Sequence, residues 1–569
     1  MILLRLTELY ERLAKEETGI PEYGFQSKEL PFIVVLERDG SFSHLEDTRH
    51  KEGKKLVGQS FLVPMERPRS GKNSYQVANW LWDHPGYLFG FNPKDKAMGQ
   101  KQHESFIRLI EEHYGKDFED EGIQALRMFL KAGSFEKIYS SDVWPEIEKK
   151  MPFMSFRLRG DDRLICQRPK VKARYLEELA RQTEQSRCLV TGREDTPARL
   201  HPKIKGVLGA KSSGALLVSF NESAYDSYGK KQGENAPVGE YAAFAYGTAL
   251  NWLLKSSRHR LRLGDTTVVF WTQKPSRIEE AMELIFSSGK LDEPQIERVK
   301  EILNAPKIGI VPEEEELPFY VLGLSPNAAR VSVRFWYEGG LGKTMANIRR
   351  YFEELTVVKR FESDPDYPTL GQLLLSTALE HKWENVPPNL TGAFFMAILQ
   401  GSRYPETLLA AVLRRVRAEA SNKYDNVSFE RAALLKALLI RNHHKEITMS
   451  LDPNRPEASY QLGRLFAVLE HLQSHAQGSL NATIRDRYYG SASSTPIAVF
   501  PTLIKLSAHH LAKLDKQNFV HWYEKMMTEI MGHLDEWPTH LSLKDQALFA
   551  LGYYHQKQDL YTKKGEENA

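Results

Sequence analysis

The C-terminal third of the sequence carries a helical pattern without strand signals. From about Thr369 to Tyr561, apolar residues recur at the three- and four-residue spacing of amphipathic helices. Prolines interrupt this pattern at intervals of helix length, and each break is expected to separate two helices: Pro387-Pro388, Pro405, Pro453, Pro501 and Pro538. The pattern predicts an all-helical bundle and confines any sheet to the preceding part of the chain.

The earlier part of the chain alternates short strand and helix patterns. Leu3–Lys15 has helical spacing, Phe32–Leu36 has the composition of a buried strand, and Arg330–Tyr337 is a further strand candidate. The whole chain is therefore expected to be α+β: a mixed N-terminal α/β region with irregular basic loops, followed by an all-α C-terminal helical bundle. The predicted regions are an N-terminal α/β region with a basic finger loop (1–150), a basic β-rich region (151–345), a first helical part (346–448) and a C-terminal bundle (449–569).

Composition sets further limits. A chain of 569 residues with 41% hydrophobic and 27% charged residues can bury a sizeable core. Its net charge is only +3, but the excess of Lys and Arg is concentrated between residues 151 and 275. Cys166 and Cys188 form no CxxC motif, which excludes a Cys-based zinc site and suggests a reducing compartment. No apolar run is long enough to cross a bilayer, so we expect a cytoplasmic protein without a membrane partner.

The segment His201–Trp252 concentrates glycines, lysines and side-chain amides. Ala215–Phe220 is expected to be a short buried strand with a loop on each side. Glycines allow close backbone approach, and Lys, Ser, Asn and Gln supply the donors that phosphates and base edges accept. The candidate donors of the two loops are Lys211, Ser212, Ser213, Lys230, Lys231, Gln232 and Asn235. The alternative is two ordinary surface loops flanking a core strand.

Two further basic segments are candidates. Pro64–Tyr75 is a turn-rich loop that carries Lys72 and Asn73 near its tip. It is either a solvated hairpin loop or a basic finger suited to groove entry or phosphate contact. Arginines and lysines recur between Arg157 and Arg174, and RLRGDDRLICQ (157–167) within this stretch predicts a hairpin. They form either a basic stripe or a solvated sheet face.

No catalytic constellation emerges from the spacing of residues. GGLGKT at Gly339–Thr344 lacks the first glycine of a P-loop and favours a strand-to-helix turn. The adjacent histidine pairs have no partner at metal-ligand spacing, and His201 is either a loop anchor or a ligand. We therefore expect no catalytic residue, no metal and no cofactor. The alternative is a nucleic-acid-processing enzyme, a nuclease, whose catalytic residues are dispersed in the sequence.

A series of motifs in fixed order carries a resemblance to a known family. They are CLVTG (188–192), HPKIKGV (201–207), SSGALLVSFN (212–221), SYGKKQGENAPV (227–238), FAYGTALNWLL (244–254) and GDTTVVFW (264–271). The C-terminal stretches YQLGRLFAVLEHLQ, NATIRDRYYGSASSTP and HLSLKDQALFALGYYHQKQDLYTKK belong to the same pattern. Together they resemble the large subunit of the type I-C CRISPR Cascade, the Csd-one family, over nearly the whole chain.

The resemblance implies a non-catalytic subunit that contacts both DNA and RNA. Such a subunit lies beside the crRNA 5′ handle, recognises the PAM in target double-stranded DNA, helps to open the duplex and supports the displaced strand. Base pairing with the crRNA then supplies sequence selection. The implied protein partners are the Cascade backbone and handle-binding subunits, a small subunit from the same gene, and a helicase–nuclease recruited in trans.

Within this resemblance the candidate donors take separate roles. The lysines are expected to bind phosphates, while Asn73, Gln232 and Asn235 are candidates for base-edge contacts or strand separation. Met449 is a candidate internal translation start for the small subunit, the alternative being an ordinary loop residue. Arg485, Arg487 and Lys505 are candidate contacts to the displaced strand or its backbone, or else solvated helix-surface residues.

Overall fold

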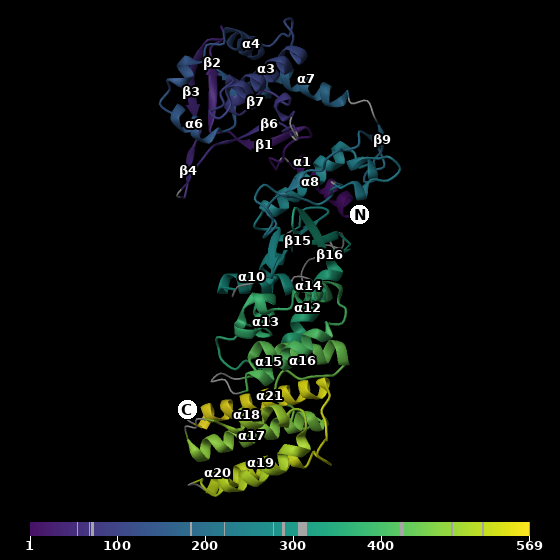
Figure 1. Ribbon diagram of the computed structural model, residues 1–569. Helices are drawn as coiled ribbons and strands as arrows, with labels where there is room; N and C mark the ends of the chain where they lie inside the picture. The colour runs from purple at the N-terminus through teal and green to yellow at the C-terminus, as the bar shows by residue number, and fades with distance from the viewer. Residues whose placement is uncertain are drawn as a thin grey trace. The chain divides into compact units, whose positions relative to one another are not determined.

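The computed structural model forms two compact units, each assembled from two stretches of chain (Figure 1). The first unit comprises Met1–Pro202 and Val218–Trp252, and the second comprises Lys203–Leu217 and Leu253–Ala569. The structure describes residues 1–16, 18–53, 55–67, 69, 73–181, 185–220, 222–276, 278–286, 291–304, 316–420, 426–478, 482–514 and 517–567. The two units interleave along the chain because residues 203–204 and 215–216 belong to the same sheet as strands from residue 260 onward.

A four-stranded sheet with the order β3-β2-β8-β7 organises the first unit. Its strands are β2 (Phe32–Leu36), β3 (Phe42–Asp47), β7 (Trp82–Asp83) and β8 (Met154–Leu158). β2, with the sequence FIVVL, is buried along its whole length and pairs antiparallel with β3 and parallel with β8. A parallel pair needs a long crossover connection, which residues 37–153 supply. Residues just beyond 150 thus belong to the same sheet as residue 32.

Helices of the crossover cover this sheet and begin at well-formed caps. Asp95 accepts a hydrogen bond from the Met98 amide at the start of α3, and Asp120 accepts one from Ile123 at the start of α4, which packs against β2 and β8. The elements of this part are α1 (Ile2–Lys15), β1 (Phe25–Glu29), β4 (His50–Glu52), β5 (Lys55–Val57), β6 (Ser60–Pro64), η1 (Ser74–Gln76), α2 (Pro85–Phe89), α3 (Lys96–His113), α4 (Glu121–Ala132), α5 (Glu136–Tyr139), α6 (Trp144–Lys150), η2 (Ile165–Gln167) and α7 (Pro169–Ala180).

The first unit ends in a loop-rich segment and a buried helix. Its elements are β9 (Ser186–Arg187), β10 (Glu194–Asp195), η3 (Ser223–Tyr225), η4 (Gln232–Asn235) and α8 (Glu240–Lys255). On α8, the rings of Tyr241 and Phe244 meet those of Tyr10 and Tyr23 edge to face. This aromatic cluster holds α8 against α1, so the loops that precede α8 have a fixed base.

The second unit begins with a six-stranded sheet of order β11-β12-β16-β15-β14-β13. The strands are β11 (Lys203–Ile204), β12 (Ala215–Leu216), β13 (Arg260–Leu263), β14 (Thr266–Thr272), β15 (Pro318–Asn327) and β16 (Arg330–Gly340). β14 is buried throughout, and β15 and β16 form a long antiparallel hairpin. β12 pairs in parallel with β16 through Leu216 and Arg330 alone. The strand expected over Ala215–Phe220 is therefore confined to its first two residues.

Helices fill the rest of the second unit, and one hydrophobic core runs from its sheet to the last helix. They are α9 (Ile278–Ile285), α10 (Glu293–Asn304), α12 (Leu341–Leu355), α13 (Leu370–Ser376), η6 (Leu379–His381), η7 (Trp383–Asn385), α14 (Pro388–Gln400), α15 (Glu406–Ala418), α16 (Phe429–His443), α17 (Ala458–Gln477), α18 (Ile484–Ala492), α19 (Pro496–Leu511), α20 (Gln517–Met531) and α21 (Leu543–Glu567). The α+β class with an all-helical C-terminal part is confirmed.

The prolines of the helical part behave in two ways. Pro388 and Pro496 occupy the first helical position of α14 and α19, where a missing N–H costs nothing, and Pro405 precedes α15. Pro501, in contrast, lies inside α19, which continues through it. The helix break predicted at Pro501 is wrong: the helix persists with the loss of a backbone hydrogen bond.

Candidate nucleic-acid interface

The basic segment from Arg157 to Arg174 is paired with carboxylates. Arg157 contacts Glu46 at 2.6 Å, and Arg168 bridges Asp120 at 2.9 Å and Asp161. Further pairs join Arg159 with Glu37, Lys170 with Glu119, Lys172 with Glu22, and Arg174 with Glu177 and Glu178. Because these carboxylates largely neutralise the segment, it does not form the unbroken basic stripe that was one interpretation of its sequence.

The N-terminal finger is anchored by its arginine. Arg69 pairs with the buried carboxylate of Asp83 and lies 4.0 Å from the ring centre of Tyr87. Asn73 is exposed, and its carbonyl accepts the Gln76 amide at 3.0 Å at the start of η1. Lys72 lies outside the described residues. Asn73 is thus the member of this predicted site that the structure locates, on a loop with a fixed base.

The glycine-rich turn between β11 and β12 belongs to the second unit. Lys211, Ser212 and Ser213 are all exposed at its tip, which the Gly214 amide closes by donating to the Lys211 carbonyl at 2.9 Å. Gly214 has φ +92°, and a Cβ there would lie 2.9 Å from Lys203 Cβ, so the turn requires glycine. In the described part of the chain no carboxylate pairs with the Lys211 ammonium group.

A second turn, in the first unit, presents Lys230 and Lys231. The Lys230 amide donates to the Ser227 carbonyl at 3.0 Å, and the two residues between them, Tyr228 and Gly229, both have positive φ. This is the backbone of a two-residue hairpin turn. Both lysines are exposed, and within the described ranges neither ammonium group has a carboxylate partner. We call residues 226–235 the lysine hairpin.

The lysine hairpin is fixed to the segment that precedes it. The Gly233 amide donates to the Arg199 carbonyl at 3.3 Å, and a Cβ at Gly233 would lie only 2.0 Å from the Ala198 oxygen. Just after the hairpin, the Gly239 amide donates to the Cys188 sulfur at 3.2 Å. The amides of Val190 and Thr191 donate to the same sulfur, and these bonds lower the pKa of Cys188 against the effect of its burial. Cys188 therefore organises the base of the hairpin.

Two of the predicted base-reading amides also hold the hairpin together. Asn235 accepts the Ser227 amide at 3.0 Å and donates to the carbonyls of Lys230 at 3.2 Å and Gln232 at 3.0 Å. Both of its N–H donors are thereby engaged. The Gln232 side-chain oxygen accepts from Arg199 at 2.9 Å. The structure brings Lys230, Lys231, Gln232 and Asn235 together on one hairpin, with Asn235 as its brace.

Sequence reasoning missed the residue at the tip of this hairpin. Tyr228 is 99% exposed, more than any other large hydrophobic side chain among the described residues. The pair Tyr-Gly between Ser227 and Lys230 was the available signal, because a glycine in a two-residue turn leaves its neighbour at the apex. A turn signal alone does not say whether that neighbour folds back onto the protein.

The candidates on the helical part separate by burial. Arg487 on α18 and Lys505 on α19 are exposed. Arg485 is only 8% exposed and its guanidinium donates to the Ala420 carbonyl at 3.0 Å, with Glu470 and Asp486 nearby. We therefore no longer include Arg485 among the proposed strand contacts, since its side chain stabilises the helical core.

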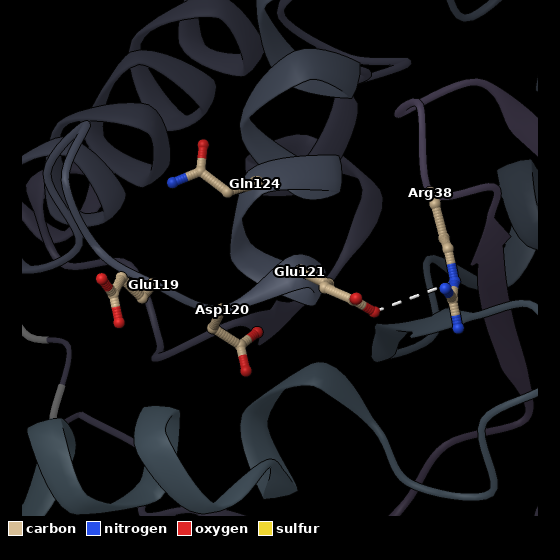
Figure 2. Close-up of a pocket in the computed structure, with 5 residues that line it drawn as sticks. All are labelled: Arg38, Glu119, Asp120, Glu121 and Gln124. Carbon is tan, nitrogen blue, oxygen red and sulfur yellow. Dashed lines mark ion pairs between the residues drawn. The ribbon is translucent and has the colours of Figure 1, made fainter.

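The acidic residues around the start of α4 line an open depression of about 390 Å³ with Arg38 and Gln124 (Figure 2). Each of its carboxylates has a basic partner: Glu119 with Lys170, Asp120 with Arg168, and Glu121 with Arg38. Over the described ranges, no group of three His, Cys, Asp or Glu side chains is arranged to hold a metal ion. The depression thus offers no unpaired acid pair for phosphodiester hydrolysis.

The remaining motifs have local structural roles. His201 is buried, and its Nδ1 lies 2.8 Å from the Tyr246 hydroxyl on α8. Burial lowers the pKa of His201 to about 4, so the ring is neutral at physiological pH. The GGLGKT segment is the strand-to-helix turn predicted for it, where β16 ends and α12 begins, and Thr344 donates to the Gly340 carbonyl at 2.9 Å.

The family to which the chain belongs follows from its sequence. A family model described as CRISPR-associated protein (Cas_Csd1) matches residues 6–561 of the chain. The chain belongs to this family, that of the large subunit of the type I-C Cascade, which confirms the resemblance carried by its motifs. A search of curated proteins found no match. No helix in the described residues is long and apolar enough to span a membrane.

Proposed function

We propose that this chain is the non-catalytic subunit with which a crRNA-guided type I-C Cascade reads DNA. In this proposal it recognises the PAM in duplex DNA, helps to unwind the duplex and stabilises the R-loop for a recruited helicase–nuclease. Its RNA contact is the crRNA 5′ handle, and its protein neighbours are the backbone and handle-binding subunits. Membership of the CRISPR-associated family supports this assignment.

The observation that carries the proposal is the contrast among the basic side chains. Lys211, Lys230 and Lys231 are exposed on turns with defined backbones, and among the described residues none of them pairs with a carboxylate. Binding to DNA gains free energy when a cation replaces counterions at a phosphate, and a lysine already paired with a carboxylate contributes less. These lysines are therefore the strongest phosphate ligands on the two turns.

The polar residues of the turns take complementary roles. Ser212 and Ser213 are exposed hydroxyl donors beside Lys211, and Asn73 is an exposed amide on the N-terminal finger. Gln232 keeps its amide nitrogen for a base edge while its oxygen holds Arg199. Asn235 acts as the brace that fixes the lysines, because both of its donors are engaged within the hairpin.

The helical C-terminal part fits a second product of the same gene. Met449 is exposed between α16 and α17. Translation initiated there would produce a protein of residues 449–569 that contains all of α17 to α21. Within that fragment α17 packs against α18, α19, α20 and α21, which gives it a core of its own. Substituting Met449 with Leu should abolish a co-purifying small subunit, and an undiminished small band would rule out this start.

PAM selection by the reconstituted complex tests the central proposal. Cascade containing this chain and its crRNA should enrich a few PAM sequences from duplexes randomised beside the target. The variant Lys211→Gln should weaken binding to all of them. Equal binding to every PAM sequence would contradict the reading role. DNA cleavage by the purified chain that EDTA abolishes would instead identify a nuclease.

A further inference from the structure

We propose that Tyr228, at the tip of the lysine hairpin, is a stacking platform for an unpaired nucleobase. This inference rests on the proposed DNA-binding function and assigns a specific contact within it. Tyr228 is 99% exposed, whereas tyrosine in a folded protein normally buries much of its ring. In the described part of the chain, neither its ring nor its hydroxyl has a partner. The side chain thus contributes no contact that stabilises the fold.

The backbone of the turn does not favour tyrosine at this position. Tyr228 has φ +53° and Gly229 has φ +75°. At the first of two such positions asparagine, aspartate or glycine is preferred, because a side chain with a bulky Cβ substituent is disfavoured at positive φ. A turn shaped by folding alone would carry one of these residues. The presence of an exposed ring therefore requires an explanation outside the folded chain.

The hairpin fixes the backbone that carries the ring. Asn235 ties both strands together through the Ser227 amide and the Lys230 carbonyl. The Glu234 carboxylate accepts the Lys231 amide at 2.9 Å, which fixes the returning strand. Because this backbone is already ordered, it loses little conformational entropy when a ligand stacks on the ring.

The groups around the ring complement different parts of a nucleotide: the lysines its phosphate, and the ring its base. Lys230 and Lys231 follow Tyr228 after Gly229 and offer to phosphates ammonium groups that have no carboxylate partner among the described residues. Asp226, on the other side of the turn, is exposed and disfavours a phosphate at the tip itself. An aromatic face beside a cationic strand is the arrangement with which proteins hold single-stranded nucleic acid, since every base offers a π face.

A protein partner fits the tip less well. Binding hot spots on proteins are large side chains surrounded by further contacts that exclude water. Here the sequence neighbours of Tyr228 are Asp226, Ser227 and Gly229, which are small or charged and exposed. An isolated ring without an apolar surround suits a flat base better than a protein pocket.

The test measures the affinity of the full-length chain for a single-stranded oligonucleotide of mixed sequence. Tyr228→Asn removes the ring and places at positive φ a residue that tolerates it, so the turn is retained. We expect affinity to fall about tenfold or more, the range of one lost base stack. Tyr228→Trp should bind at least as well as the native chain. Leu189→Ala, which removes another exposed apolar side chain of the same unit, should have no effect.

A second oligonucleotide, with abasic positions, allows the protein and DNA changes to be combined as in a double-mutant cycle. The native chain should bind it as weakly as Tyr228→Asn binds the normal oligonucleotide, and the substitution should cause little further loss there. Equal affinity of the native and Tyr228→Asn chains for normal DNA would overturn the inference. So would a loss confined to association with other Cascade subunits, which would make the tip a protein contact. If Lys230→Gln with Lys231→Gln still lowers affinity in that case, the DNA-binding function stands without the stacking contact.

Discussion

Two basic segments of the first unit differ in whether their cationic side chains pair with carboxylates. Residues 157–174 are rich in arginine and lysine, and six of these seven side chains pair with carboxylates. The lysine hairpin, residues 226–235, has fewer cations, but its two lysines have no carboxylate partner among the described residues. The density of positive charge along the sequence is thus a poor guide to the charge that a ligand meets.

The difference lies in what surrounds each segment. Residues 157–174 leave the sheet and enter α7, and acidic residues of β3, of α7 and of neighbouring loops surround them. The hairpin projects from a base of backbone hydrogen bonds around Cys188 and Arg199. The half-buried pairs of the first segment, such as that of Arg168 with Asp120, stabilise the fold, whereas the charges of the second remain available for a partner.

Arg168 gives the largest expected effect on the paired side of this comparison. Arg168→Met should lower the free energy of unfolding by about 3 kcal/mol, because the carboxylate of Asp120 is 6% exposed and would lose its cation. DNA affinity should not change. Urea unfolding measures the loss, and Asp120→Asn in the same variant should restore part of it. A change in DNA affinity with unaltered stability would mean that Arg168 binds DNA and does not stabilise the fold, which would contradict the proposed difference between the two segments.

Acidification should weaken the frame that carries the hairpin. Unfolded His201 takes up a proton below about pH 6.5, whereas in the folded chain its pKa is about 4. Between these values the unfolded state binds more protons, so stability falls as pH falls, by about 2 kcal/mol from pH 7 to pH 5. Other buried histidines, such as His84 and His103, also have lowered pKa values, so urea unfolding at both pH values should show a loss larger by about 2 kcal/mol in the native chain than in His201→Gln. The same pH dependence in both chains would contradict the assignment.

Removing the hairpin charges should leave stability unchanged. Lys230→Gln with Lys231→Gln should alter the free energy of unfolding by less than about 0.5 kcal/mol, since both side chains are exposed and have no carboxylate partner in the described part of the chain. DNA affinity should fall about tenfold at low salt. The slope of log affinity against log salt should become less steep by about 2, one counterion for each lysine. An unchanged slope would remove these lysines from the interface.

The smallest effect is expected at the exposed edge of the paired segment. The Arg159 side chain is 67% exposed in its pair with Glu37, so Arg159→Gln should not measurably change stability or DNA binding. The hydrogen bond from Arg159 is the main cause that lowers the pKa of Glu37, and the substitution should raise that pKa toward its ordinary value. NMR titration of Glu37 measures this rise, and an unmoved pKa would mean that the pair does not form in solution.

Periodicity along the chain predicted the α+β class, the helical C-terminal part and the strand-to-helix turn at Gly340, because these depend on local spacing. It could not predict the pairing of Arg157 with Glu46 or of Arg168 with Asp120, since these partners lie 111 and 48 residues apart in the chain. The interleaving of the two units was hidden for the same reason. The pairing of β12 with β16, which places residues 203–217 in the second unit, joins strands that are far apart in the chain.

The sequence indicated which turns are exposed better than it indicated what each side chain in them contacts. Glycine, lysine and amide residues correctly marked two exposed turns, where Lys211, Lys230 and Lys231 lie. Composition did not reveal that the Asn235 side chain bonds within its own hairpin, or that Arg485 is buried. Both facts depend on which way a side chain turns after packing. The apex residue Tyr228 was overlooked because aromatic residues are usually counted toward the core.

The parallel pairing of β12 with β16 has a consequence for synthesis on the ribosome. The turn that carries Lys211 is made early, but its strand joins the sheet only through Leu216 and Arg330. Until residue 330 has left the exit tunnel, this strand has no neighbour in the sheet except β11. The Lys211 turn is therefore synthesised before most of its sheet. It is nevertheless among the last parts to be joined to that sheet, because β16 is made later.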